Sequence, residues 1–187
     1  MMQRGIRNVS MDDIAKGLHI SKKTIYVHFK DKGNLTLAIV ANELESLENW
    51  MQENEKTAIN CIEEFSRLAN RMIDWLLDWH LSSLDDLRVS CHPAYELYVR
   101  FNEDKVKRIF NSNRERGINE NCYHSNWNSE LIVANALMMI SNCRDIILEK
   151  RPDFSPFSIK QYFIAHFLFG LCRHANQKDT LRCLSSV

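Results

Sequence analysis

A short stretch near the N-terminus concentrates side chains that bind phosphates and the edges of nucleic-acid bases. In this stretch a serine is followed by two lysines, a threonine, a tyrosine and a histidine: Ser21, Lys22, Lys23, Thr24, Tyr26 and His28. Basic side chains at the start of a helix can reach base edges in the major groove, and polar side chains further along it can contact phosphates. Lys32 follows where the free N–H groups of the next helix also favour an anion. These residues predict recognition of double-stranded nucleic acid.

Two short helices are needed to position these side chains. Ser10 is a good N-cap for a helix beginning at residue 11, whose first turn carries Asp12 and Asp13. That helix should stop near residues 17–19, and Ser21 caps the next helix about three residues later, which makes a helix-turn-helix. The expected apolar contact set is Ile14, Ala15, Leu18, Ile20, Ile25 and Phe29. An isolated lysine pair is more often part of a solvated basic helix, but the two caps and the apolar spacing favour the helix-turn-helix.

The charge distribution supports a polyanionic partner at this end of the chain. The 187 residues carry 24 basic and 24 acidic side chains, yet residues 1–32 hold seven basic against three acidic ones. A neutral chain therefore combines a basic head with an acidic body. Hydrophobic residues make up 45% of the chain, and the five Gly and three Pro are too few for many tight turns. The composition predicts an all-α fold and argues against a β-sandwich or a low-complexity chain.

Residues 9–35 strongly resemble the DNA-binding region of the TetR family of bacterial repressors. The resemblance rests on Ile14-Ala15, Ser21-Lys-x-Thr-Ile-Tyr26, His28-Phe29 and Lys32-x-x-Leu35. It implies an α-helical homodimer that binds a palindromic operator, with a variable C-terminal domain that binds a small inducer. On this pattern Tyr26, His28 and Lys32 contact the DNA backbone, and Lys22, Lys23 and Thr24 read the groove. Ser10 and Ser21 complete the predicted DNA-binding set.

Two positions depart from the family pattern. His19 occupies a turn position where the family often has glycine, although histidine tolerates a left-handed backbone better than bulky residues do. The family also places a full helix before the position of Gly5, and only residues 1–4 precede Gly5 in this chain. We therefore expect a loosely packed head that binds DNA poorly. The expected domains are a helix-turn-helix head over residues 1–48, with its first helix largely missing, and a helical ligand-binding and dimerisation domain over residues 49–187.

Apolar periodicity predicts further helices through the acidic body. The expected ranges are 34–50, 57–80, 82–90, 93–117, 129–149 and 158–175, with a polar loop over 118–128. The last two helices are apolar on more than one face, which indicates burial both by the chain's own core and by a partner. By resemblance to the family they form the dimer interface, with Leu137, Phe163, Phe167 and Gly170 as its expected residues. A central core helix is the alternative.

The inducer site is less well defined by sequence. Large side chains suited to a mostly apolar pocket occur on two of the predicted helices, together with an asparagine that interrupts an apolar stretch: Trp75, Trp79, Tyr95, Tyr98, Phe101 and Asn102. All of these are equally suited to an ordinary core, and the asparagine to a helix irregularity. No specific ligand follows from the sequence.

Enzymatic activity and a metal site find little support. Cys91-His92, Cys122-x-His124, His166 and His174 supply thiols and imidazoles, but without paired ligand spacings or a nucleophile motif. No catalytic residue, metal or cofactor is expected. No signal peptide precedes the head and no apolar run of membrane-spanning length is evident, so we expect a cytoplasmic protein. A dimeric small-molecule-binding protein that has lost DNA binding remains the alternative to a transcription regulator.

Overall fold

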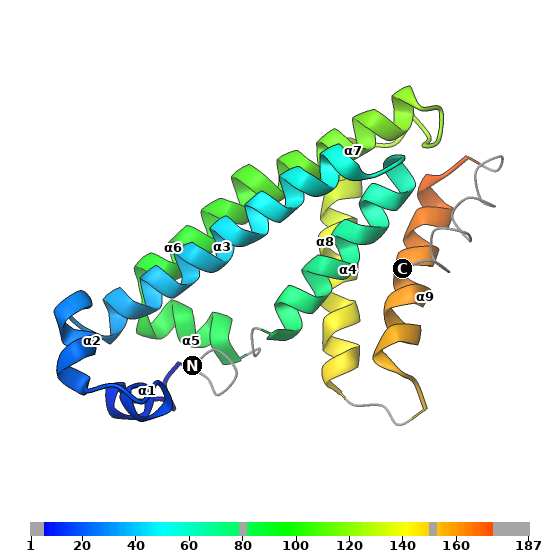
Figure 1. Cartoon of the computed structure of the whole chain (residues 1–187). Coiled ribbons are helices and arrows are strands. Elements are labelled where there is room, and N and C mark those ends of the chain that lie inside the picture. Colours follow the sequence, from blue (N-terminus) through cyan, green and yellow to red (C-terminus); the bar gives the residue numbers. More distant parts are fainter. Residues whose placement is uncertain (1–5, 79–81, 150–152, 174–187) are drawn as a thin grey trace. The chain divides into compact units, whose positions relative to one another are not determined.

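The computed structural model describes residues 6–78, 82–149 and 153–173 and is all-α within those ranges (Figure 1). Its helices are α1 (Met11–Gly17), α2 (Lys22–His28), α3 (Lys32–Thr57), α4 (Cys61–Asp78), α5 (Ser82–Ser90), α6 (His92–Phe101), the π-helical segment η2 (Asn102–Val106), α7 (Lys107–Asn119), α8 (Ser129–Leu148) and α9 (Pro156–Leu171). The described residues contain no strand, only one isolated bridge between Tyr123 and Cys172. The predicted fold class is confirmed.

The chain divides into two compact units. The first contains Met1–Asn49 and Asp78–Lys105, and the second contains Trp50–Leu77 and Val106–Val187. The first boundary between the two units, after Asn49, lies next to the domain boundary expected after residue 48. However, α5 and α6 group with the head by their internal contacts. The functional assignment of the two domains stays a prediction.

A small apolar cluster holds the helix-turn-helix together in the first unit. Its buried members come from α1, α2 and the first turn of α3: Met11, Ala15, Ile25 and Leu35. Ile14 and Phe29 pack against them partly buried, as expected. The expectation is wrong for Leu18 and Ile20, which are 61% and 42% exposed. Both lie where the chain leaves α1 and turns towards α2, outside the buried cluster.

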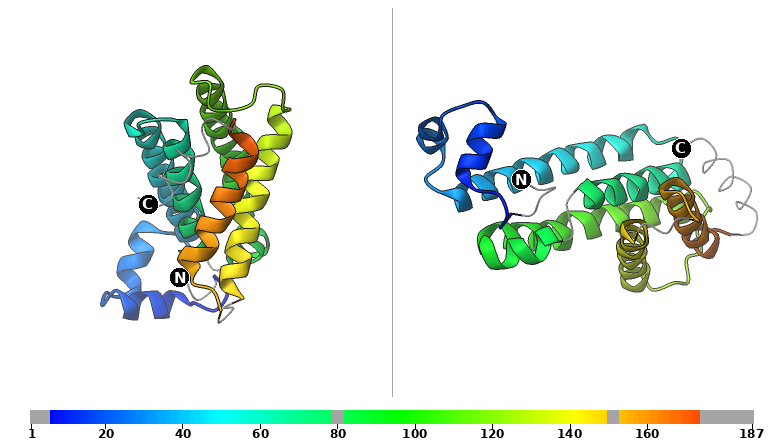
Figure 2. Two further views of the ribbon diagram at one scale, coloured as in Figure 1. Left: turned by 90° about the vertical axis from the view of Figure 1, so that its right-hand side faces the viewer. Right: turned by 90° about the horizontal axis from the view of Figure 1, so that it is seen from below.

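The second unit has a larger core centred on α4. Apolar residues of α4 at three- and four-residue spacing are buried, among them Phe65, Leu68, Met72 and Ile73. The Phe65 ring stacks on Phe167 of α9, with centroids 4.9 Å apart. Helices α8 and α9 run side by side (Figure 2). Both begin at side-chain caps, because Asn128 accepts the N–H of Leu131 and Ser155 accepts that of Ser158.

The helix expected over residues 93–117 differs from the structure in two ways. A π-helical segment begins at Asn102 and separates α6 from α7. This is the helix irregularity that the sequence left open as one explanation for Asn102. Gly117 does not end the helix, because α7 continues to Asn119 and the chain turns at Asn121 with φ of 57°. Gly117 is required for another reason. A Cβ atom there would collide with the ring of Tyr123, a fully buried residue of the following loop.

Helix α8 corrects one expectation from the sequence. Over its 20 residues it reaches a mean hydropathy of 1.5 in its most apolar window, long and apolar enough to span a membrane by length and composition alone. Core helices of soluble proteins meet the same criterion. Only 33% of that window is buried within the chain, so much of the surface of this apolar helix is exposed.

Candidate nucleic-acid interface

Helix α1 is fixed at its start by a reciprocal cap, as the sequence predicts. The backbone N–H of Asp13 donates to Ser10 Oγ at 3.2 Å, and the backbone N–H of Ser10 donates to Asp13 Oδ2 at 2.9 Å. The Ser10 hydroxyl also donates to that carboxylate at 2.5 Å. This arrangement satisfies two of the free donors at the helix start. Ser10 therefore acts first as a helix cap within the head.

The turn between the two helices depends on His19. This residue has φ of 55°, in the left-handed region where glycine is usual. The turn is closed by hydrogen bonds from the His19 N–H to the Lys16 carbonyl at 3.2 Å and from the Ile20 N–H to the Ala15 carbonyl at 3.0 Å. The chain then enters α2 at Ser21, whose Oγ accepts the N–H of Thr24 at 3.0 Å. The backbone thus delivers α2 in a fixed orientation relative to α1.

Helix α2 presents nearly all of its side chains to solvent. Ile25 is its one buried residue, and the predicted recognition residues Lys22, Lys23, Thr24, Tyr26 and His28 are all exposed. A helix attached by a single buried residue and by Phe29 leaves its remaining surface free to enter a groove. The geometry therefore suits a recognition helix.

The lysines of α2 differ in their partners. Lys22 Nζ lies 3.0 Å from Asp12 Oδ2, and this hydrogen bond and charge raise the pKa of the lysine. Within the part of the chain that the structure describes, Lys23 makes no salt bridge. The hydroxyl of Thr24 is hydrogen-bonded to that of Ser21 at 2.8 Å. Of the three residues predicted to read the groove, Lys23 therefore has the fewest competing contacts.

Lys32 is the first residue of α3, as expected. It is half-buried, and Asp31 just before it accepts the N–H of Asn34 at 2.8 Å. This backbone hydrogen bond lowers the pKa of the Asp31 carboxyl. An ammonium group held at the start of a long helix can contact a phosphate together with that helix's free N–H groups.

Three further exposed residues of the head were not among the predicted DNA contacts. Lys16 at the end of α1 and Lys30 after α2 add positive charge, and both are exposed. Val27 is 71% exposed and lies four residues after Lys23, on the same face of α2. An apolar side chain on this face suits contact with a thymine methyl group. The i, i+4 spacing from Lys23 is the signal that identifies Val27.

The predicted ligand-binding residues fall on both units. Trp75 is buried in α4, and Trp79 lies outside the described residues. In the first unit, Tyr95 and Tyr98 are half-buried, and Phe101 lines a cavity of about 380 Å³ together with residues of α3, α6 and η2. Asn102 donates to the carbonyl of Tyr98 at 2.9 Å. The cavities described within either unit do not gather these residues together, so their role stays a prediction.

Three of the four predicted dimer residues line one groove of the second unit. A groove of about 380 Å³ between α8 and α9 includes Phe163, Phe167 and Gly170, while Leu137 is half-buried in α8. The groove is bordered by exposed apolar side chains, with Met138 63% and Tyr162 67% exposed. A Cβ atom at Gly170 would meet open space. This surface, the α8/α9 groove, is apolar and uncovered by the described residues.

The sequence of the head matches known regulators. Residues 1–39 match the family of bacterial regulatory proteins, tetR family. An HTH-type transcriptional regulator of Staphylococcus aureus (strain USA300) is 42% identical over 43 residues, which are 23% of each chain. The chain therefore matches less than a quarter of the length of this curated relative.

Solved structures resemble the chain over nearly its whole length. A transcriptional regulator from Saccharomonospora viridis in complex with choline superposes with a TM-score of 0.81, at 16% identity and 92% coverage of both chains. A TetR-family regulator from Agrobacterium tumefaciens gives a TM-score of 0.71 at 19% identity, covering 91% of this chain and 90% of that one. FadR from Bacillus subtilis in complex with stearoyl-CoA gives 0.71 at 14% identity, covering 90% and 92%. These likenesses establish a shared fold.

The capped helix pair and the all-α body define a helix-turn-helix protein with a C-terminal helical domain. The match over residues 1–39 and the shared fold confirm the predicted resemblance of the head to the DNA-binding region of the TetR family.

Proposed function

We propose that this protein is a ligand-responsive transcription regulator, acting as a repressor that binds a palindromic operator as a homodimer. The observation that carries the proposal is the exposed surface of α2. A helix held by a cap and one buried residue offers Lys22, Lys23, Thr24, Tyr26 and His28 to solvent. The basic charge of the head supplies the sequence-independent part of the affinity. Such a protein acts on DNA in the bacterial cytoplasm and needs neither a catalytic residue nor a cofactor.

The two classes of DNA contact fall to different residues in this proposal. Lys32, Tyr26 and His28 bind phosphates and set the register of the head on the duplex. Lys23 and Thr24 face the groove and read bases, with Lys22 joining them once it exchanges Asp12 for DNA. Because Ser10 and Ser21 already cap their helices, they contribute by holding α1 and α2 in place.

The effector of the proposed regulator is a small molecule of unassigned structure. The choline and stearoyl-CoA in the structures of two similar proteins are ligands of those proteins. In this chain, Trp75, Trp79, Tyr95, Tyr98, Phe101 and Asn102 remain the proposed binding residues. Their aromatic surface with a few polar atoms suits a largely apolar molecule.

A second copy of this chain is the proposed occupant of the α8/α9 groove. The face is apolar along two neighbouring helices, and Gly170 leaves open space for close approach of a partner helix. A twofold dimer would present two copies of α2 to successive half-sites of one operator.

The test is binding to DNA from just upstream of the gene, measured by fluorescence anisotropy over a range of salt concentrations. The 187-residue chain is compared with a longer chain whose additional upstream residues can form a full first helix. Specific binding by the extended chain, with a shuffled duplex as the control, supports the regulator. The alternative is a dimeric small-molecule-binding protein that has lost DNA binding. Absence of binding by both chains to a library of genomic duplexes would favour it.

A further inference from the structure

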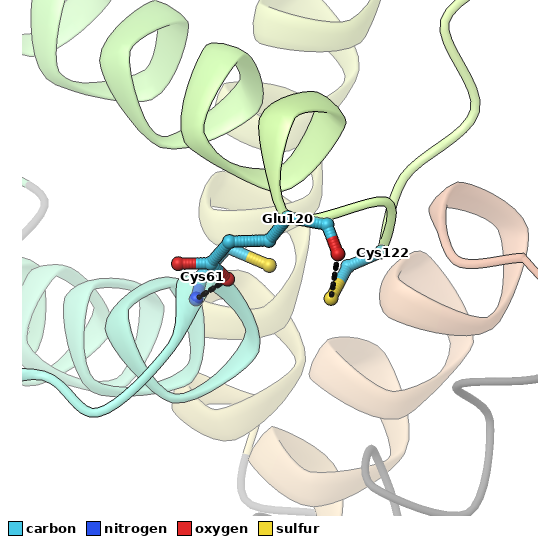
Figure 3. Close-up of side chains that lie close together, drawn as sticks. All are labelled: Cys61, Glu120 and Cys122. Carbon is cyan, nitrogen blue, oxygen red and sulfur yellow. Dashed lines mark hydrogen bonds between the residues drawn. The ribbon is translucent and has the colours of Figure 1, made fainter.

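Three metal-ligand side chains meet in the second unit, where the first turn of α4 lies beside the end of α7 (Figure 3). Cys61 is the first residue of α4, and Glu120 and Cys122 belong to the turn after α7. One ligand atom from each, two sulfurs and a carboxylate oxygen, lies within 4.8 Å of the others. Cys61 and Glu120 are 59 positions apart in the sequence, so only the fold brings this cluster together.

Hydrogen bonds hold the carboxylate of this cluster in place. The backbone N–H of Cys61 donates to Glu120 Oε2 at 2.9 Å, and Arg116 Nε donates to Glu120 Oε1 at 2.6 Å. Each carboxylate oxygen has a second lone pair, so both bonds can persist while one oxygen binds a cation. Outer partners of this kind orient a metal ligand and tune its affinity.

A buried residue, Tyr123, connects the backbone segments that carry the two cysteines. Tyr123, the neighbour of Cys122, donates its hydroxyl to the carbonyl of Cys61 at 3.0 Å. Asn113 donates to the same carbonyl at 2.9 Å. The main chains carrying the two sulfurs are therefore tied to one another through the core, which limits the reorganisation needed on binding.

We propose that Cys61, Cys122 and Glu120 bind one thiophilic divalent cation of the zinc class. Two thiolates and a carboxylate are ligands that Zn²⁺ takes, whereas Mg²⁺ and Ca²⁺ take oxygen ligands. Three protein ligands leave a fourth position for water, and solvent reaches it because Glu120 is exposed and Cys122 is half-buried. Binding replaces two S–H bonds by two metal–sulfur bonds and releases two protons to solvent.

Only a small adjustment closes the cluster around an ion. Two sulfurs at about 2.3 Å from a tetrahedral Zn²⁺ lie about 3.8 Å apart. A sulfur and a carboxylate oxygen on the same ion lie about 3.5 Å apart, so the present separations of at most 4.8 Å need to shrink by no more than about 1.3 Å.

The test is titration of the reduced, full-length protein with Co²⁺, followed by displacement with Zn²⁺. The expected result is a sulfur-to-cobalt charge-transfer band that saturates at one equivalent per chain and disappears on adding Zn²⁺. Cys122→Ser should abolish the band. Glu120→Gln keeps both sulfurs and an oxygen acceptor for the Cys61 N–H, and should weaken the affinity about tenfold or more. Cys143→Ser removes a buried thiol outside the cluster and is the matched control, which should bind like the parent.

Cys61 is fully buried, so Cys61→Ser can also reduce the stability of the fold. The test therefore depends on the variants of the half-buried Cys122 and the exposed Glu120. Circular dichroism verifies that their variants fold. A folded parent chain that gives no thiolate band would overturn the proposal, as would a band unchanged in Cys122→Ser. The site does not depend on the proposed regulator function, because metal binding is read without DNA.

Discussion

Within the head, the serine and threonine hydroxyls stabilise the starts of the helices, and the lysines are the groups proposed to bind DNA. The hydroxyls of Ser10, Ser21 and Thr24 are hydrogen-bonded within the helix starts, whereas Lys23 extends into solvent without a described partner. Lys22 lies between these cases, because DNA has to compete with Asp12 for its ammonium group. At the level of residues, we therefore expect the specificity of the head to depend most on Lys23.

Two lysine variants separate phosphate binding from base reading. Lys32→Ala should weaken binding to every duplex and reduce the salt slope by about one, because one phosphate contact is lost. Lys23→Ala should instead reduce discrimination between the operator and altered duplexes, by about 1–3 kcal/mol at the base pair concerned. Anisotropy titrations at several salt concentrations measure both effects, with the exposed Lys56 at the far end of α3 changed to alanine as the control. An unchanged salt slope in Lys32→Ala would contradict the assigned phosphate contact.

In the second unit, one arginine supports a buried carboxylate. Arg116 donates to Glu64 at 2.9 Å and to the carbonyl of Ala58 at 3.0 Å, while Glu64 is only 1% exposed. Burial raises the pKa of Glu64, and the hydrogen bonds from Asn113 and Arg116 oppose that rise. Arg116→Ala should lower the free energy of unfolding by about 3 kcal/mol, because it leaves a buried charge without its partner. Urea unfolding measures the loss, and Arg67→Ala, which removes an i, i+4 surface pair, is the control.

The same variant should respond to pH. Without Arg116 the pKa of Glu64 rises further, so the folded variant retains a proton that the unfolded chain has released. The stability deficit relative to the parent should therefore shrink as the pH falls from neutral towards the ordinary range of a glutamate. A deficit that stays constant over this range would show that Glu64 is not the group affected.

The helices were more predictable than the contacts between them. Caps at Ser10 and Ser21 follow from local rules and are present. Apolar spacing also located α4 and α8 to within a few residues. The interruption at Asn102 left the irregularity of the π-helical segment open. The buried Tyr123 loop depends on a contact between distant segments, and its polar, asparagine-rich stretch gives no local sign of it. The cluster of Cys61, Glu120 and Cys122 was missed for the same reason.

Gly117 provides a test at the level of one helix. Gly117→Ala should destabilise the second unit by about 1–3 kcal/mol despite alanine's better helix propensity, because the new methyl group displaces the Tyr123 ring. Thermal or urea unfolding measures the change. Gly17→Ala is the matched control, since it adds the same methyl group to α1 with nothing within 4 Å. Equal effects of the two variants would contradict the packing role of Gly117.

At the scale of the whole molecule, the exposed apolar surface of the α8/α9 groove predicts self-association. Met138→Glu places a charge on that groove without disturbing the core, because the side chain is 63% exposed in the single chain. The variant should sediment as a monomer and should lose most of its affinity for a palindromic duplex while retaining its helical content. Ile59→Glu is the control, because this residue is 81% exposed and lies before α4, away from the groove. A parent chain that is itself monomeric at micromolar concentration would contradict the proposed dimer.

The contact of Tyr123 with Cys61 also bears on the order in which the second unit folds. The hydroxyl and the carbonyl that it joins are 62 residues apart, and the ring can settle over Gly117 only after α7 has formed. Closing so long a loop has a large entropic cost that only the docked helices repay. The loop should therefore become ordered late, after α4 and α7 have associated. In refolding followed by pulsed hydrogen exchange, the amides of Cys122 and Tyr123, both bonded to the Gly117 carbonyl, should gain protection after those of α7.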